Sequence, residues 1–229
     1  MLLKKIIKKI FLHFSNPILA IKFDIRKLYY TYCYFKLKFV YNVTIPIEKR
    51  YFVPDYCDLY NLFNIIIKHK PRKSIEVGSG YSTFIIMKAL EINEKKHNIT
   101  PYLVSIEQDD EYLAIHKNYL KENLNKNTFE KIKLIKTDLK IETIKNTSVS
   151  ICSNFPHDNY NFFYEDRTDD NIFKIAGDAI KIESSMPKNF IICVDGMIDT
   201  VKFYKQNLTR DYHFSGGFFH GNTWIPKKI

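Results

Sequence analysis

The sequence lacks the features that mark several classes of protein. Its four cysteines form no Cys-x-x-Cys pair and fit no zinc-site spacing. No run of about 20 apolar residues occurs, which excludes a membrane-spanning helix, and no apolar stretch with a small-residue cleavage site marks a signal peptide. We therefore expect a cytoplasmic protein with reduced, buried thiols at Cys33, Cys57, Cys152 and Cys193.

Acidic residues are scarce at one end of the chain. Of the 229 residues 45% are hydrophobic and 26% charged, as in globular proteins, and the length allows one domain with an appendage. In the first 50 residues eleven lysines and arginines face two acids, a net charge of +9, while the other 179 residues carry +1. We therefore divide the chain into a basic, aromatic-rich N-terminal extension (1–50) and a nearly neutral domain (51–229).

The extension has helical patterns. Residues 1–14 predict an amphipathic helix, with apolar side chains on one side and four lysines on the other. Residues 18–41 interleave tyrosines and phenylalanines with basic residues, a composition that suits an anionic membrane surface. Two other interpretations stay open: a helical cap packed on the domain, and a segment that stacks on single-stranded nucleic acid. Because the domain itself is neutral, we do not expect nucleic acid to be the partner.

A short strand, a glycine turn and a helix follow the first helix of the domain. Residues 55–70 predict that helix, 73–77 the strand and 84–90 the next helix. Gly78 and Gly80 let the backbone approach a ligand without a Cβ clash. The hydroxyls of Ser82 and Thr83 can cap the second helix, whose free N–H groups face the same place.

The loop departs from the dinucleotide pattern. A third glycine would complete Gly-x-Gly-x-x-Gly, but Thr83 stands there, which weakens an NAD interpretation. Glu76, just before the turn, is a second departure, and its negative charge suits a cationic ligand such as the amino and sulfonium groups of S-adenosylmethionine.

Acids also follow the next two predicted strands. Glu107 ends the strand 102–106, where its carboxylate would accept two hydrogen bonds from a ribose diol. Asp138 comes just after the strand 131–136, where an adenine amino group could be read. The alternation of strands and helices predicts a parallel sheet covered on both faces.

Residues 75–83 (Ile-Glu-Val-Gly-Ser-Gly-Tyr-Ser-Thr) with 105–109 (Ser-Ile-Glu-Gln-Asp) resemble the class I S-adenosylmethionine-dependent methyltransferases, and in particular a bacterial branch with a Gly-Ser-Gly-Tyr-Ser-Thr loop. The resemblance covers about residues 55–225. It implies an α/β fold, a Rossmann-like three-layer α/β/α sandwich with a mostly parallel seven-stranded sheet and a C-terminal antiparallel hairpin. It also implies a cofactor site formed by Glu76, Gly78, Ser79, Gly80, Ser82, Glu107 and Asp138.

The second half supplies the candidate catalytic acids. Glu165 and Asp166 end a predicted strand at 161–166, and in similar methyltransferases this end faces both the methyl group and the acceptor. Asp195 ends the next strand, 190–196. We predict that one of these acids orients or deprotonates a hydroxyl. No Asp/Asn-Pro-Pro-Tyr motif occurs, which argues against methylation of DNA adenine or glutamine.

The last elements complete the predicted sheet. We expect a helix at 200–208, then strands at 212–215 and 218–225 around a Gly216-Gly217 turn, and an exposed loop at 146–159. Oxygen ligands for Mg²⁺ could come from several acids, but solvated loop acids are the commoner case, so we predict no metal. Those acids are Asp166, Asp169, Asp170, Asp195 and Asp199.

These patterns lead to a predicted function. The cofactor is S-adenosyl-L-methionine, and the methyl acceptor is a hydroxyl of a small molecule or a glycan. An enzyme that uses NAD or a nucleotide sugar on a similar sheet is one alternative, and an inactive membrane-peripheral scaffold is another. With its basic extension, the protein is expected in the cytoplasm, peripheral to the inner face of the membrane.

Overall fold

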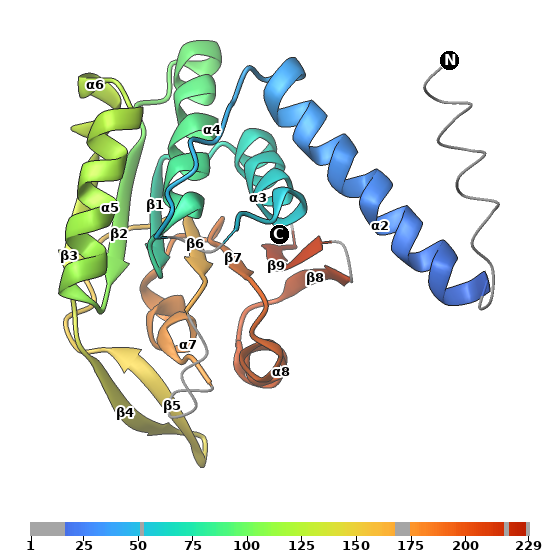
Figure 1. Cartoon of the computed structure of the whole chain (residues 1–229). Coiled ribbons are helices and arrows are strands. Elements are labelled where there is room, and N and C mark those ends of the chain that lie inside the picture. The colour runs from blue at the N-terminus through green and yellow to red at the C-terminus, as the bar shows by residue number, and fades with distance from the viewer. Residues whose placement is uncertain (1–16, 51–52, 168–174, 218–219, 228–229) are drawn as a thin grey trace, which may run out of the picture.

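A computed structural model describes residues 17–50, 53–167, 175–217 and 220–227, so the predicted helix at 1–14 lies outside the described residues. Seven strands form one sheet in the order β3-β2-β1-β6-β7-β9-β8 (Figure 1). The strands of this sheet are β1 (Lys73–Val77), β2 (Tyr102–Glu107), β3 (Ile132–Lys136), β6 (Phe162–Glu165), β7 (Ile191–Val194), β8 (Tyr212–Gly217) and β9 (His220–Pro226). Five strands run parallel, and β9 pairs antiparallel with β7 and β8. The predicted fold class is confirmed.

Helices cover both faces of the sheet (Figure 1). On one face lie α3, α4 and α5, whose buried side chains join those of alternate strand residues. On the other face lie α7, α8 and the small β4–β5 hairpin. The bounds are α2 (Pro17–Phe35), η1 (Lys36–Val40), α3 (Tyr56–His69), α4 (Tyr81–His97), α5 (Asp110–Asn123), α6 (Lys126–Phe129), β4 (Leu139–Ile144), β5 (Thr147–Cys152), α7 (Asp178–Ile182), η2 (Glu183–Ser185) and α8 (Ile198–Asn207). No helix among the described residues is long and apolar enough to cross a bilayer.

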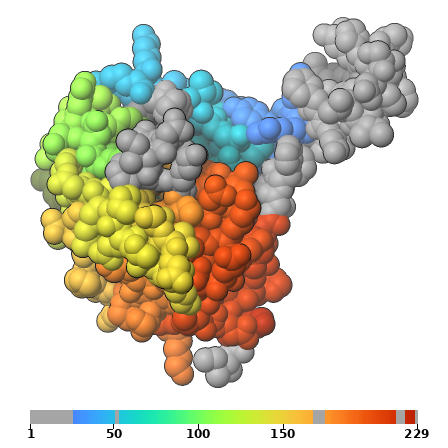
Figure 2. Space-filling view, turned by 90° about the horizontal axis from the view of Figure 1, so that it is seen from below, coloured from blue at the N-terminus to red at the C-terminus, as the bar shows by residue number. Residues whose placement is uncertain are grey.

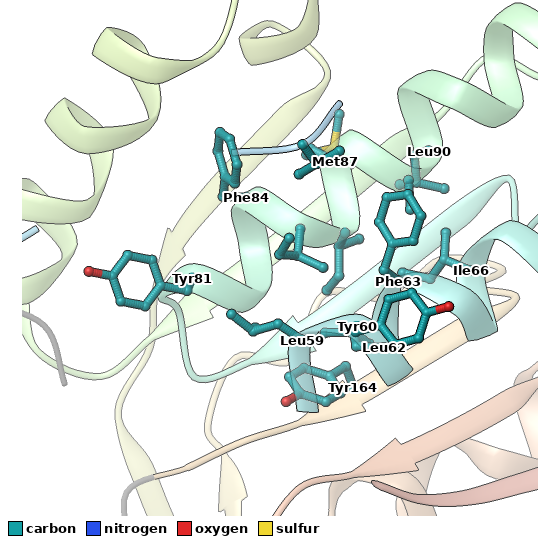
Figure 3. Packing of buried hydrophobic residues seen from close by; sticks show 14 of the residues in the cluster. Leu59, Tyr60, Leu62, Phe63, Ile66, Tyr81, Phe84, Met87, Leu90 and Tyr164 are labelled. Atoms are coloured by element: carbon teal, nitrogen blue, oxygen red, sulfur yellow. The ribbon is translucent and has the colours of Figure 1, made fainter. Parts of the chain in front are cut away.

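Local sequence explains where α3 and α4 begin and end. The Asp55 carboxylate accepts the Cys57 N–H at 2.8 Å and caps α3, and Lys70 ends that helix in a left-handed conformation before Pro71. Asn98 ends α4 in the same way. The two helices pack through large apolar side chains, among them Phe63 of α3 and Leu90 of α4 (Figure 3). This packing fixes the N-termini of both helices above the same edge of the sheet.

Two details of the sequence-based prediction are wrong. Much of the predicted loop at 146–159 is β5, because Val149 and Ile151 alternate with polar residues and bury their side chains. Gly216 and Gly217 are not the hairpin turn: both belong to β8, so the connection to β9 lies at 218–219, outside the described residues. Gly216 has a packing reason instead, since a Cβ there would come within 2.4 Å of the Phe214 ring.

The sheet has one switch point. The chain runs outward from β1 to β3 and then returns to place β6 on the other side of β1. At such a point two loops leave the carboxyl ends of neighbouring strands in opposite directions, and parallel sheets bind ligands there. Here the loops are those after β1 and β6.

Candidate active site

A cavity of about 440 Å³ opens at this switch point. Its walls are the loops after β1, β2, β3, β6 and β7, together with the N-termini of α3 and α4. Two of the predicted catalytic acids and five of the predicted cofactor-binding residues line it: Asp166, Asp195, Gly78, Ser79, Gly80, Ser82 and Glu107. Glu76, Asp138 and Glu165 do not line it.

Gly78 is required by the packing of the protein itself. Its φ is +93°, a conformation that favours glycine, and its N–H donates to the Ile106 carbonyl at 3.0 Å. A Cβ at this position would lie 1.8 Å from the backbone oxygen of Asp166. The missing side chain therefore lets the loops after β1 and β6 touch, which is a reason for glycine here in addition to the predicted approach to a ligand.

Gly80 leaves space in the cavity. Its φ of 167° is extended backbone, which any residue adopts, and a Cβ there would meet only the Tyr112 hydroxyl, at 3.7 Å. The Gly80 N–H donates to Thr83 Oγ1 at 3.3 Å, so the first turn of α4 is tied back to the loop. The next residues in the turn, including Ser82, keep their N–H groups directed toward the start of the helix, where a negative group is favoured.

Glu107 holds the cavity wall together. One of its oxygens accepts the Ser79 N–H at 3.2 Å and the Ser79 hydroxyl at 2.8 Å. The other accepts the backbone N–H groups of Gln108 and Asp109 at 2.8 and 3.1 Å. The side chain is thereby fixed at the carboxyl end of β2, with only 8% of the residue exposed. These four donors occupy the roughly four lone-pair sites of the carboxylate, so a diol would bind here by replacing one of them, such as the Ser79 hydroxyl.

Asp138 lies away from the cavity. Its side chain is 83% exposed and forms an ion pair with Lys136 at 2.9 Å. The cavity is lined instead by its neighbours Thr137 and Leu139. Successive residues of an extended chain point in opposite directions, so the residue after and the residue before Asp138 face the cavity while Asp138 faces solvent.

Glu165 belongs to a buried ion-pair cluster on the other side of the sheet. Arg167 lies 2.7 Å from Glu165 and forms a second ion pair with Asp178 in α7. The Tyr204 hydroxyl donates to Glu165 at 3.0 Å, and neither the glutamate nor the arginine has a side chain exposed by more than 4%. Desolvation raises the pKa of Glu165 despite its partner. The prediction that Glu165 reaches an acceptor is thus wrong, because strand alternation turns it away from Asp166.

Glu76 is buried beneath the glycine loop. None of its surface is exposed, and the hydroxyls of Ser82, Thr83 and Ser105 are its neighbours. Desolvation raises its pKa to about 8, so near neutral pH the carboxyl group is mostly protonated. It supports the loop from below. The sequence predicts that Glu76 lines the cofactor site, but it does not form part of the cavity surface.

The other end of the cavity gathers three acids. Asp166 follows β6, Asp195 follows β7, and Asp58 comes from the first turn of α3. Burial and their mutual repulsion raise the pKa of both Asp58 and Asp166 to about 7, and burial raises that of Asp195. Asp166 is open to solvent through the cavity, but protein surrounds it on its other sides. The Tyr164 hydroxyl donates to Asp195 at 3.3 Å.

Sequence reasoning missed Asp58, because α3 precedes the glycine loop and no local pattern says which strands its N-terminus faces. The residues after Asp55 do signal a capped helix start, but the pairing with Asp166 and Asp195 is tertiary. It also missed Tyr112, which lines the cavity from α5. Among the described residues no group of three or more His, Cys, Asp or Glu side chains could hold a metal ion, and Asp169 and Asp170 lie outside the description.

Comparisons with known proteins show which solved structures share this architecture. No protein-family profile and no curated protein matches the sequence. The structure of an S-adenosylhomocysteine-bound methyltransferase, PaMTH1 of Podospora anserina, superimposes with a TM-score of 0.55 at 12% identity, over 95% of this chain and 98% of that one. The methyltransferase domain of METTL16 gives 0.50 at 13% identity, over 87% and 79%. At such identities the likeness concerns the fold alone, so the chain has the Rossmann-like fold that these methyltransferases share.

Proposed function

We propose that this chain is an S-adenosylmethionine-dependent methyltransferase whose acceptor is a hydroxyl group of a small molecule or glycan. The observation that carries the proposal is the single cavity that joins the glycine loop after β1 to the acids after β6 and β7. The fold shared with a methyltransferase bound to S-adenosylhomocysteine supports the same cofactor. The closer resemblance to the bacterial branch with the Gly-Ser-Gly-Tyr-Ser-Thr loop stays a prediction.

The residues present fit this cofactor. The open space above Gly80 offers a cradle for the methionine end, and Glu107 offers acceptor oxygens for a ribose diol. The described residues of the lining include six acids and one basic residue, Arg167. Arg167 forms ion pairs with Glu165 and Asp178, which neutralise its charge. A negative cavity favours a positively charged ligand. When bound, S-adenosylmethionine supplies an electrophilic methyl group on a sulfonium centre.

The acids at the other end can prepare the acceptor. A carboxylate with a pKa of about 7 is half deprotonated at neutral pH and is a stronger base than an ordinary aspartate. Asp166 is open to the cavity and can take the proton of a hydroxyl held beside it. Asp195 is held by Tyr164 and can orient the same group. We assign Asp166 as the base and Asp195 as the orienting residue.

Calorimetric titration of the full-length protein with S-adenosylmethionine and with S-adenosylhomocysteine tests the cofactor. We expect both to bind, and the absence of heat from folded protein would refute the proposal. Titration with NADH, followed by fluorescence transfer, is the parallel arm for the dinucleotide alternative. Binding of NADH without binding of S-adenosylhomocysteine would favour that enzyme class.

Transfer of a labelled methyl group to glycan and small-molecule extracts tests the reaction. Because the base must be deprotonated, the rate should rise with pH through about 7, the raised pKa of Asp166, and Asp166→Asn should abolish it. The matched control is Asp199→Asn, an exposed acid that does not line the cavity. Analysis of the product decides between O- and N-methylation. Binding of S-adenosylhomocysteine with no transfer to any extract would support the inactive scaffold.

A further inference from the structure

One side of the helix formed by α2 and η1 carries large apolar side chains that the described protein leaves about half exposed, although one of them, Tyr32, also contacts the Tyr60 ring of α3 with 5.9 Å between the ring centres. Leu28, Tyr32, Phe35 and Phe39 are 51%, 46%, 53% and 62% exposed. Their spacing of four, three and four residues places them in one row along the helix. We call these four residues the α2 face. An ordinary surface carries such side chains singly, not in a row.

The opposite side of the same helix already has a partner. Cys33 and Leu37 are completely buried against the core that contains α3. The Tyr29 hydroxyl donates to Asn61 of α3 at 3.0 Å. Figure 1 shows α2 on the outer side of α3, with α3 between it and α4. The cap interpretation therefore accounts for one side of the helix and leaves the α2 face to be explained.

Basic side chains frame the α2 face. Lys36 Nζ lies 5.5 Å from the centre of the Tyr32 ring, and Lys38 Nζ lies 5.5 Å from that of Phe39. Residues 17–41 contain five basic residues and one acid, a net charge of +4. Two copies joined through this face would bring like charges together, which is unfavourable. The charge therefore favours an anionic partner.

We infer that the α2 face docks on an anionic lipid bilayer. Its apolar row suits the boundary between head groups and acyl chains, its rings suit the interface, and lysines extend from their apolar stems to phosphates. Nucleic acid would satisfy the charges but would leave Leu28 and the outer side of Phe35 exposed. In the space-filling view, the described part of α2 lies at the edge of the body (Figure 2).

The helix that carries the α2 face also contacts residues that line the cavity. Arg26 forms an ion pair with Asp55 at 3.6 Å, and the Tyr30 hydroxyl lies 3.5 Å from the Pro54 carbonyl. Both Asp55 and Pro54 line the cavity. A bilayer on the α2 face would therefore lie near the end of the cavity that holds the acids, as a lipid-linked acceptor would need. The docking itself does not rest on the proposed function.

Sedimentation of the full-length protein with vesicles tests the inference. The vesicles are phosphatidylcholine alone, or phosphatidylcholine with about a quarter phosphatidylglycerol, at about 0.1 M and about 0.5 M salt. We expect binding to the anionic vesicles, with release at high salt. Replacement of all four residues of the α2 face by serine should weaken binding about tenfold or more. The matched control is the double variant Ile141→Ser, Ile198→Ser, because these exposed side chains lie elsewhere on the surface.

Equal binding of the four-serine variant and the wild type would overturn the inference, as would equal binding to neutral and anionic vesicles. So would a salt-resistant dimer of the free protein that the four-serine variant loses, because the α2 face would then join two copies. S-adenosylhomocysteine titration of every variant separates a failure of docking from a failure of the proposed function.

A reporter on the face keeps the test independent of the serine variant's stability. The only native tryptophan, Trp224, is 3% exposed, so its emission should change little. In Phe39→Trp the new indole replaces the most exposed ring of the α2 face. Its emission should move to shorter wavelength with anionic vesicles. An unchanged spectrum under conditions in which the protein sediments with the vesicles would place the contact elsewhere and overturn the inference.

Discussion

Two neighbouring glycines differ in what a side chain would meet. At Gly78 a Cβ collides with the Asp166 backbone, and φ is +93°, so Gly78→Ala should cost about 3 kcal/mol or more of folding free energy. At Gly80 the backbone is extended and the nearest atom is 3.7 Å away. Gly80→Val should therefore leave stability within about 1 kcal/mol but fill the cradle and abolish binding of S-adenosylhomocysteine. Urea unfolding and calorimetric titration measure the two quantities. A destabilised Gly80→Val, or unchanged affinity in it, would contradict the assignment.

Glu107 and Asp138 are a second pair, both acids at strand ends. Glu107→Gln keeps the shape of the side chain but replaces an acceptor oxygen by a donor. We expect affinity for S-adenosylhomocysteine to fall about 10- to 100-fold, the value of one hydrogen bond to a charged group. Asp138→Asn, on an exposed side chain, should change it by less than twofold. Circular dichroism must show that Glu107→Gln is folded, because Ser79 and Gln108 also donate to this residue. An equal loss of affinity in both variants would contradict the assignment of Glu107, and not Asp138, to the cofactor site.

At the scale of elements, the sequence predicts what is local. The strand, glycine turn and helix of β1 and α4 follow from hydrophobic runs and turn residues between positions 73 and 90. The β4–β5 hairpin was missed because its turn, Lys145-Asn146, uses two positive-φ residues without a glycine. The sequence also could not predict toward which face of the sheet the side chains of Glu165 and Asp138 point, because a shift of one residue in a strand end exchanges the two faces.

The buried cluster behind the sheet joins β6, β5 and α7. Arg167 compensates Glu165 and Asp178, and it also donates to the Ser150 hydroxyl at 3.0 Å. Arg167→Met would leave two buried carboxylates without a counter-charge, which should cost about 3–5 kcal/mol in urea unfolding. Arg210→Met is the control, because Arg210 donates to backbone carbonyls nearer the surface and should cost about 1 kcal/mol. Similar losses in both variants would mean that the ion pairs add little.

At the scale of the whole molecule, three separate elements bring Asp58, Asp166 and Asp195 into one cavity. The pKa of Asp58 is raised from an ordinary value of about 3.9 to about 7, so folding favours its protonated form. Its contribution to stability is complete below about pH 4 and is lost as pH rises through 7. Asp58→Asn should therefore melt about 2–4 °C above the wild type at pH 8, a modest gain because the residue is partly exposed, and should show no gain at pH 4. Calorimetric melting measures both. A gain that does not depend on pH would assign the effect to packing.

The boundary of the folded unit depends on how α2 and η1 pack. The sequence predicts an extension of residues 1–50 beside an independent domain, yet α2 and η1 bury side chains against α3, and the Tyr41 and Phe63 rings lie 4.7 Å apart. Removal of residues 1–16 should leave S-adenosylhomocysteine affinity and the urea midpoint unchanged while it removes four lysines and weakens vesicle binding. Removal of residues 1–41 should also expose the side of α3 that Cys33 and Leu37 cover, at a cost of about 2 kcal/mol for each buried side chain. The longer truncation should therefore unfold at lower urea or aggregate. If both truncated proteins unfold at the wild-type midpoint, the helix is an appendage of the surface, and the folded unit begins after it.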